Sequence, residues 1–173
     1  MLTHSVVWWS VLTLLTAATI LDIWSRRIPN WLVAPFLVAG VVVSAATGGV
    51  KGLGHSIGGV ALAVVVTGIL CWLGGMGMGD LKLCAAAGAW IGFAQMGTAL
   101  VATGVAGGLM ALIWASCHGS LSESLDGSGD LVRGFWTRGI RPHPSLVLTN
   151  PAARAMPYAP AIAIGTIFSF LAV

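Results

Sequence analysis

The sequence contains few charged residues. Only 8% of its 173 residues are Asp, Glu, Lys or Arg, against about a quarter in a typical soluble domain. Hydrophobic residues make up 57% of the chain, and the mean hydropathy is +0.95. This balance excludes an ordinary soluble domain. It predicts an all-α polytopic membrane protein, with residues 1–173 forming a single membrane-embedded domain.

Other motifs that the sequence lacks exclude further classes of function. No run of basic residues is interleaved with aromatic residues, so we predict no nucleic-acid partner. The three cysteines, Cys71, Cys84 and Cys117, lie far apart in apolar segments and form no CxxC motif. This arrangement favours small buried side chains over a disulfide or a zinc site. The four histidines are also scattered, and we therefore predict neither a metal nor another cofactor.

The first apolar run extends from Val6 to Trp24. No Lys or Arg precedes it, and Arg26-Arg27 follow it directly. A secretory signal has its positive charge in front, so this run predicts a retained helix with its N-terminus outside. Ile28-Pro29-Asn30 then ends the helix, because proline disfavours helical geometry in the residue before it.

Charge placement decides the remaining topology. We predict spans at residues 31–46 and 53–73, joined by a short outer loop at 47–52. The uncharged stretch 81–116 is too long for one span, and we place a tight turn in it at Gln95–Thr98. Two spans there put the polar segment 118–156, with its four arginines, in the cytoplasm as the positive-inside rule requires. With a last span at 158–173, the prediction is six transmembrane helices and both termini outside.

One stretch, Gly75 to Lys82, interrupts the apolar region with a carboxylate and an ammonium. An ionisable residue within a membrane is costly and usually functional, which singles out Asp80. The alternative is that Asp80 caps a helix. Asp22, in the last turn of the first span, raises the same question, and its alternative role is an ion pair with Arg26 one turn away.

The predicted topology brings these two aspartates to one side of the membrane. Asp22 ends an inward-running helix and Asp80 begins an outward-running one, so both lie near the cytoplasmic face. Paired carboxylates suit peptide hydrolysis, because one takes a proton from water while the other donates a proton to the carbonyl oxygen. Helix dipoles favour Asp80 as the anion and Asp22 as the acid, and the charges of the nearby Arg26 and Lys82 leave this assignment open.

The pattern G-x-G-D occurs twice in the chain. The second copy, Gly127-Ser128-Gly129-Asp130, lies among Ser, Asp and Glu residues in the polar segment. We interpret it as a solvated turn. Only Gly77 to Asp80 opens an apolar helix, and its glycines allow a non-helical approach of the backbone to a substrate.

Three motifs in this order resemble the type IV prepilin leader peptidases, which are membrane aspartyl proteases named for G-x-G-D. The first is Asp22 followed by Arg27-Ile28-Pro29-Asn30, and the second is Gly77-Met78-Gly79-Asp80 with Lys82. The third is the segment Met156 to Gly165, which is similar to the family's last-helix motif. The long segment 118–156 departs from the most compact members.

The resemblance implies a membrane aspartyl endopeptidase in the inner membrane of a prokaryote. It implies cleavage of the short basic leader of a pilin-like precursor after Gly, just before the hydrophobic stretch of the precursor, at the cytoplasmic face. Larger members carry paired CxxC motifs in an extra domain and also methylate the new N-terminus. This sequence lacks those cysteines, so it resembles the short form that serves tight-adherence pili, without methyltransferase activity. The implied catalytic residues are Asp22 and Asp80, and the implied motif or substrate-adjacent residues are Gly77, Gly79, Lys82, Arg27, Pro29 and Asn30.

Three other functions stay open at this point. A proton- or ion-coupled transporter would use the aspartates as a relay, but no charge lies deep in the other predicted spans. A non-catalytic membrane subunit of a pilus or secretion assembly would pair the aspartates with Arg26 and Lys82. A related protease of the archaeal preflagellin type would share the mechanism but not the substrate. The sequence does not indicate an oligomeric state.

Overall fold

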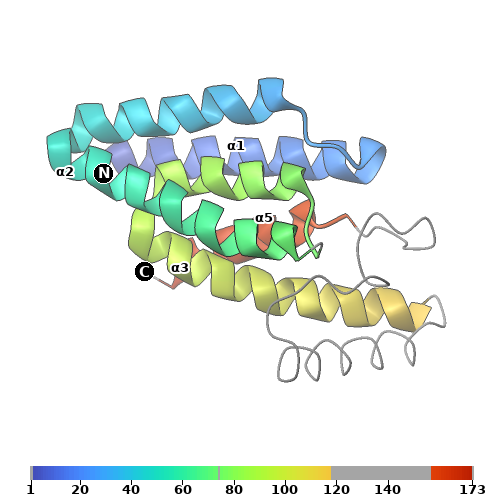
Figure 1. Cartoon of the computed structure of the whole chain (residues 1–173). Coiled ribbons are helices and arrows are strands. Elements are labelled where there is room, and N and C mark those ends of the chain that lie inside the picture. The colour runs from blue at the N-terminus through green and yellow to red at the C-terminus, as the bar shows by residue number, and fades with distance from the viewer. Residues whose placement is uncertain (1, 74, 118–156, 173) are drawn as a thin grey trace.

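The computed structural model describes residues 2–73, 75–117 and 157–172, and these residues are all-helical with short connections. The helices run closely alongside one another (Figure 1). All-helical structure follows from the apolar composition, because a helix satisfies its own backbone hydrogen bonds where water is absent. The predicted polar segment 118–156 lies outside the described residues. The helices are α1 (Leu2–Ser25), α2 (Asn30–Trp72), α3 (Met78–Cys117) and α5 (Ala159–Leu171).

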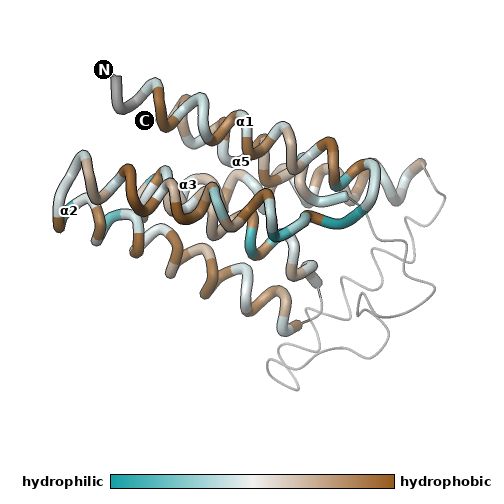
Figure 2. The backbone as a smooth tube through the Cα atoms, turned by 90° about the horizontal axis from the view of Figure 1, so that it is seen from above, coloured by the Kyte–Doolittle hydropathy of each residue, from teal (hydrophilic) through white to brown (hydrophobic). Residues whose placement is uncertain are grey.

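The connection between α1 and α2 confirms the break predicted at Ile28-Pro29-Asn30. Arg26 leaves the helix with a left-handed φ of 51°, and Pro29 is extended at φ −74° and ψ 144°. The backbone N–H of Arg26 still bonds to the carbonyl of Asp22, at 2.9 Å, which closes the last turn of α1. Figure 2 shows hydrophilic residues at this connection, whereas the helices are mostly pale or hydrophobic.

Two glycines turn the long helices back on themselves. Gly49 in α2 has φ 57° and ψ −140°, and Gly92 in α3 has φ 73° and ψ −175°. Figure 1 shows both helices doubling back at the end of the bundle that is remote from the α1–α2 connection. Two of our predictions are corrected here. The break in α3 lies at Gly92, and Gln95–Thr98 is helical, while the outer loop predicted at 47–52 reduces to a single non-helical residue.

Serine side chains stabilise the break at Gly92. The hydroxyl of Ser56, which is buried, donates to the carbonyl of Ala89 at 2.8 Å, and Ser44 donates to the same carbonyl at 3.3 Å. Ala89 lies one turn before the position where helical geometry fails, so its carbonyl needs another donor. A Cβ at Gly92 would overlap the ring of His55, so glycine is required for space as well as for φ.

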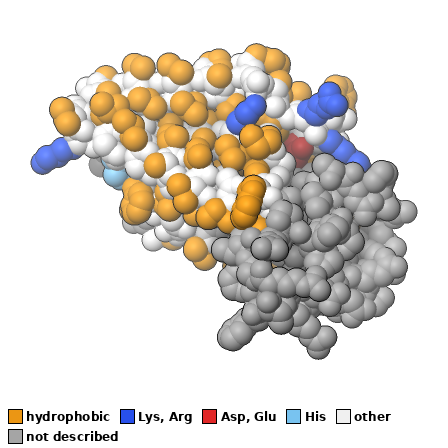
Figure 3. Space-filling model, viewed as in Figure 1, with side chains coloured by type: hydrophobic (Ala, Val, Ile, Leu, Met, Phe, Trp, Pro, Cys, Tyr) orange, Lys and Arg blue, Asp and Glu red, His pale blue; other side chains and the backbone are white. Residues whose placement is uncertain are grey.

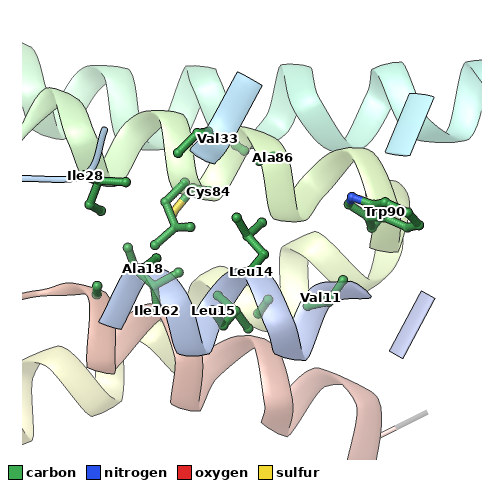
Figure 4. Packing of buried hydrophobic residues seen from close by; sticks show 14 of the residues in the cluster. Val11, Leu14, Leu15, Ala18, Ile28, Val33, Cys84, Ala86, Trp90 and Ile162 are labelled. Carbon is green, nitrogen blue, oxygen red and sulfur yellow. The ribbon is translucent and has the colours of Figure 1, made fainter. Parts of the chain in front are cut away.

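The core lies where α1, α2, α3 and α5 meet (Figure 4). Leu14 and Leu15 of α1, Leu83 of α3 and Ile162 of α5 are all fully buried there. Small residues bring the backbones close together beside this core. A Cβ on Gly88 would lie 2.6 Å from the carbonyl oxygen of Gly59, so α2 and α3 cross with backbone in direct contact.

Three helices are long and apolar enough to cross a membrane, namely α1, α2 and α3, while α5 is a shorter apolar helix. Trp24, Trp31 and Trp72 are exposed around the two connections at one end of the bundle, as residues at a membrane–water interface commonly are. Six crossings, and the side on which each terminus lies, stay predictions.

The first prediction concerns topology. In a full-length chain without its native cysteines, Lys51→Cys should react with a membrane-impermeant thiol reagent added outside, and Ser25→Cys should not. Both positions are exposed, and they lie near opposite ends of the bundle. Labelling of intact cells and of inverted membrane vesicles measures this directly. Reaction of Ser25→Cys from outside would contradict the predicted orientation.

The second prediction concerns the contact between α2 and α3. Gly88→Ala should lower the free energy of unfolding by about 1–3 kcal/mol, because the new methyl group meets the backbone of Gly59. Gly104→Ala in the same helix is the matched control, since a Cβ there meets nothing within 4 Å. It should be neutral or stabilising by up to about 1 kcal/mol. Thermal unfolding in detergent compares the two, and equal effects would refute the close crossing.

Candidate active site

Asp22 lies in the last turn of α1 and is buried, with 7% of its surface exposed. Its Oδ2 accepts a hydrogen bond from the backbone N–H of Ala159, at 3.0 Å. Ala159 is the first residue of α5, so this N–H is one of those that a helix N-terminus leaves without an intrahelical partner. The Asp22 carboxyl therefore sits at the positive end of α5.

Asp80 is the third residue of α3. Its backbone N–H donates to the carbonyl of Gly77 at 3.2 Å, and its carboxyl takes part in a backbone hydrogen bond with Gly77. A Cβ at Gly77 would lie 3.2 Å from Asp80 Oδ2, closer than most Cβ contacts. This resembles the half of a capping box in which the third helical residue reaches back to the cap. Asp80 thus lies inside the first turn of α3 and is not the N-cap residue that the capping alternative expected, and its carboxyl is held by the contact with Gly77.

The two aspartates lie close enough for the charge of Asp22 to act on the Asp80 carboxyl. In Figure 1 the end of α1 and the start of α3 lie at the same end of the bundle. Figure 3 shows acidic atoms at this end, close to Lys and Arg atoms. Two like charges in a partly buried site oppose each other, so ionising both carboxyls costs more than ionising one.

Three further side chains are close enough to interact electrostatically with Asp80. They are the thiols of Cys71 and Cys84 and the phenol of Tyr158. Cys71 also donates to the carbonyl of Gly77, with 3.5 Å between sulfur and oxygen. These three groups come from the end of α2, the first turns of α3 and the residue before α5.

The motif residues of the two halves meet beside this pair. A Cβ on Gly79 would touch the side chain of Ile28, at 3.4 Å from its Cβ. The ammonium of Lys82 donates to the side-chain oxygen of Asn30 at 2.9 Å. The segment that follows Asp22 and the segment around Asp80 are thus held together by one close packing contact and one hydrogen bond.

Arg27 and Pro29 take up other positions. Arg27 is exposed, and its carbonyl accepts a hydrogen bond from the hydroxyl of Ser25 at 3.3 Å. Pro29 precedes α2, and its carbonyl accepts the first backbone bonds of that helix. These contacts give both residues a local role at the connection that follows Asp22.

Our sequence reasoning did not assign a role to the start of α5. The backbone N–H of Ala159 donates to Asp22, and Tyr158 is close enough to Asp80 to interact with it electrostatically. The sequence signal for this region is the motif segment Met156 to Gly165, which contains both residues. A Cβ on Gly107 of α3 would overlap the Tyr158 ring, so this glycine leaves room for it.

The second G-x-G-D copy, with Asp130, lies outside the described residues, as do the four arginines of segment 118–156. Within the residues that the structure describes, no group of three His, Cys, Asp or Glu side chains is arranged to hold a metal ion.

Comparison with known proteins adds an independent observation. Residues 9–113 match the family model described as the type IV leader peptidase family. The chain is 31% identical over 105 residues to a prepilin leader peptidase/N-methyltransferase of Aeromonas hydrophila, and 30% identical over 105 residues to one of Aeromonas salmonicida (strain A449). Each match covers 57% of this chain and 36% of the relative, so the chain matches about a third of the relatives' length. No solved structure matches.

The matched region contains both aspartates and the connections that follow and precede them, but it ends before α5. The family model matches more than half of the sequence, so the assignment of the chain to a family does not rest on the short motifs alone. The chain belongs to the type IV leader peptidase family.

Proposed function

We propose that this chain is a membrane aspartyl endopeptidase, with Asp22 and Asp80 as its catalytic pair. The observation that carries the proposal is that residues 58 positions apart in the sequence come together, by way of separate helices, at one end of an apolar bundle. A structural ion pair would join an aspartate to a cation. Here, a carboxyl is brought beside a second carboxyl, which is costly unless the two share a proton.

The proposed mechanism needs only the two carboxyls and a water molecule. The ionised carboxyl takes a proton from water as the oxygen attacks the scissile carbonyl carbon, and the protonated carboxyl donates its proton to the carbonyl oxygen. A tetrahedral intermediate results. On its collapse, the carboxyl that gained a proton gives it to the departing amine, and the other regains its own from the hydroxyl. The peptide is then cleaved and the pair is restored.

The structure leaves the assignment of acid and base open. The dipole of α3 favours Asp80 as the anion, because Asp80 lies in the first turn of that helix. However, the Asp22 carboxyl also accepts an N–H at a helix N-terminus, from α5. Each carboxyl thus has a backbone donor that stabilises its charged form, which removes the asymmetry on which that argument depended.

The proposed substrate is a pilin-like precursor whose basic leader is cleaved after Gly at the cytoplasmic face. Family membership and the names of the relatives support a prepilin-like substrate. The site lies beside the α1–α2 connection and the glycine-rich stretch before α3, both at one end of the bundle. The proposal covers peptide cleavage alone, and the 173 residues contain no CxxC motif on which methyl transfer was expected to depend.

The rival functions predict different behaviour. A transporter relay needs ionisable groups distributed across the bundle, whereas Asp22 and Asp80 are at the end of α1 and the start of α3 and are close enough for their charges to interact. A non-catalytic assembly subunit would need the aspartates only for stability, and it would not cleave a precursor when purified.

The third prediction concerns the catalytic pair. Asp22→Asn and Asp80→Asn preserve size and hydrogen-bonding capacity but remove the ionisable group, so each should abolish cleavage of a pilin-like precursor. The double variant should be little worse than either single variant, because residues acting as one unit are not additive. Cleavage is followed by N-terminal sequencing of the product, with protein level and thermal unfolding measured on the same samples.

The matched control is Asp130→Asn, in the other G-x-G-D copy, which should cleave at the wild-type rate. A folded Asp22→Asn or Asp80→Asn protein that still cleaves near the wild-type rate would falsify the aspartyl mechanism. Wild-type protein that cleaves no pilin-like precursor would favour the assembly subunit instead.

A further inference from the structure

The hydrogen bond between Lys82 and Asn30 joins two segments that are 52 residues apart. Asn30 is the first residue of α2, directly after the connection that follows Asp22. Lys82 is in the first turns of α3, two residues after Asp80. Lys82 is therefore on the same helix as Asp80, and Asn30 is separated from the helix that carries Asp22 only by the four residues of the α1–α2 connection.

The chemistry of the bond is unambiguous. An ammonium has three donors and no acceptor, so the atom of Asn30 that lies 2.9 Å away is the amide oxygen. The positive charge of the ammonium strengthens the bond. Because the acceptor is a neutral amide, no carboxylate has to be desolvated to form it. Its acceptor, Asn30, is not one of the two aspartates.

A second contact lies directly beside the bond. Gly79 packs against Ile28 so closely that an added Cβ would touch the Ile28 side chain. Gly79 precedes Asp80, and Ile28 lies within the α1–α2 connection and is buried. The two contacts act together. The contact of Gly79 with Ile28 limits how near the start of α3 comes to the α1–α2 connection, and the Lys82–Asn30 bond limits how far the two separate.

We propose that Lys82 and Asn30 are a positioning pair, whose hydrogen bond holds the start of α3 against the α1–α2 connection and thereby sets the separation of the Asp22 and Asp80 carboxyls. Neither residue needs to touch substrate for this role. The expected effect on cleavage rests on the proposed function, whereas the effect on the separation of positions 22 and 80 does not.

The fourth prediction is a loss of kcat without a matching change in KM. Lys82→Met and Asn30→Leu should each lower kcat by about tenfold to a hundredfold, the scale expected when a catalytic group is misplaced by about 1 Å. The double variant should lose no more than either single variant, because one bond is removed in all three. Lys82→Arg and Asn30→Asp each keep a donor facing an acceptor, and they should lose much less.

Lys51→Met is the matched control. Lys51 is exposed beside the Gly49 turn, at the other end of the bundle, and its replacement removes the same charge without touching the site. It should retain the wild-type kcat. Additive losses in the Lys82→Met/Asn30→Leu double variant, or an equal loss in Lys51→Met, would overturn the positioning role.

A measurement that needs no activity separates failure of this proposal from failure of the proposed function. In the full chain without native cysteines, Asp22→Cys and Asp80→Cys are joined by bifunctional thiol reagents with spacers of graded length. With the Lys82–Asn30 bond intact, we expect efficient cross-linking over a narrow range of spacers. Lys82→Met or Asn30→Leu should broaden that range, and Lys51→Met should not. An unchanged range in both site variants would overturn the proposal, whether or not the wild-type chain cleaves a precursor.

Discussion

The repulsion between two carboxyls in a largely apolar bundle is the constraint on which the rest of the site depends. Asp22 is buried at the end of α1, and its charge acts on the Asp80 carboxyl at the start of α3. Each carboxyl is accompanied by a backbone hydrogen bond, from Ala159 for Asp22 and with Gly77 for Asp80. These bonds offset part of the cost of bringing the acids together, and in the proposed mechanism a shared proton offsets much of the remainder.

The architecture places all the necessary segments at one end. Gly49 and Gly92, which have positive φ angles, reverse α2 and α3 at the end of the bundle remote from the site. Both helices therefore return toward the site. Ser56 satisfies the carbonyl of Ala89 that the second reversal would leave without a donor. The glycine-rich stretch before Asp80 then brings backbone close to the acid, because a side chain at Gly77 would press against its carboxyl.

The sequence predicts those features that depend on composition and charge, and it misses those that depend on backbone geometry. Proline and the paired arginines mark the end of α1, and the isolated aspartates mark the site. The reversal of α3 was placed at Gln95–Thr98 because polar residues suggest a turn, yet it occurs at Gly92, where space beside His55 and a left-handed φ decide the position. The bond from Ala159 to Asp22 has no side-chain signature, since any non-proline residue supplies a backbone N–H. Hydropathy alone also leaves the number of crossings a prediction.

The most direct test of the shared-proton site is the pH dependence of kcat/KM for cleavage of a pilin-like precursor by the wild-type chain. Activity should fall at low pH, as the carboxyl that acts as base becomes protonated, and fall again at higher pH, as the carboxyl that acts as acid loses its proton. The two limbs should belong to the pair and not to either residue separately. A bell-shaped profile, with precursor binding and thermal stability unchanged across the same range, is the result that this account predicts. A profile that is flat across both limbs would contradict it.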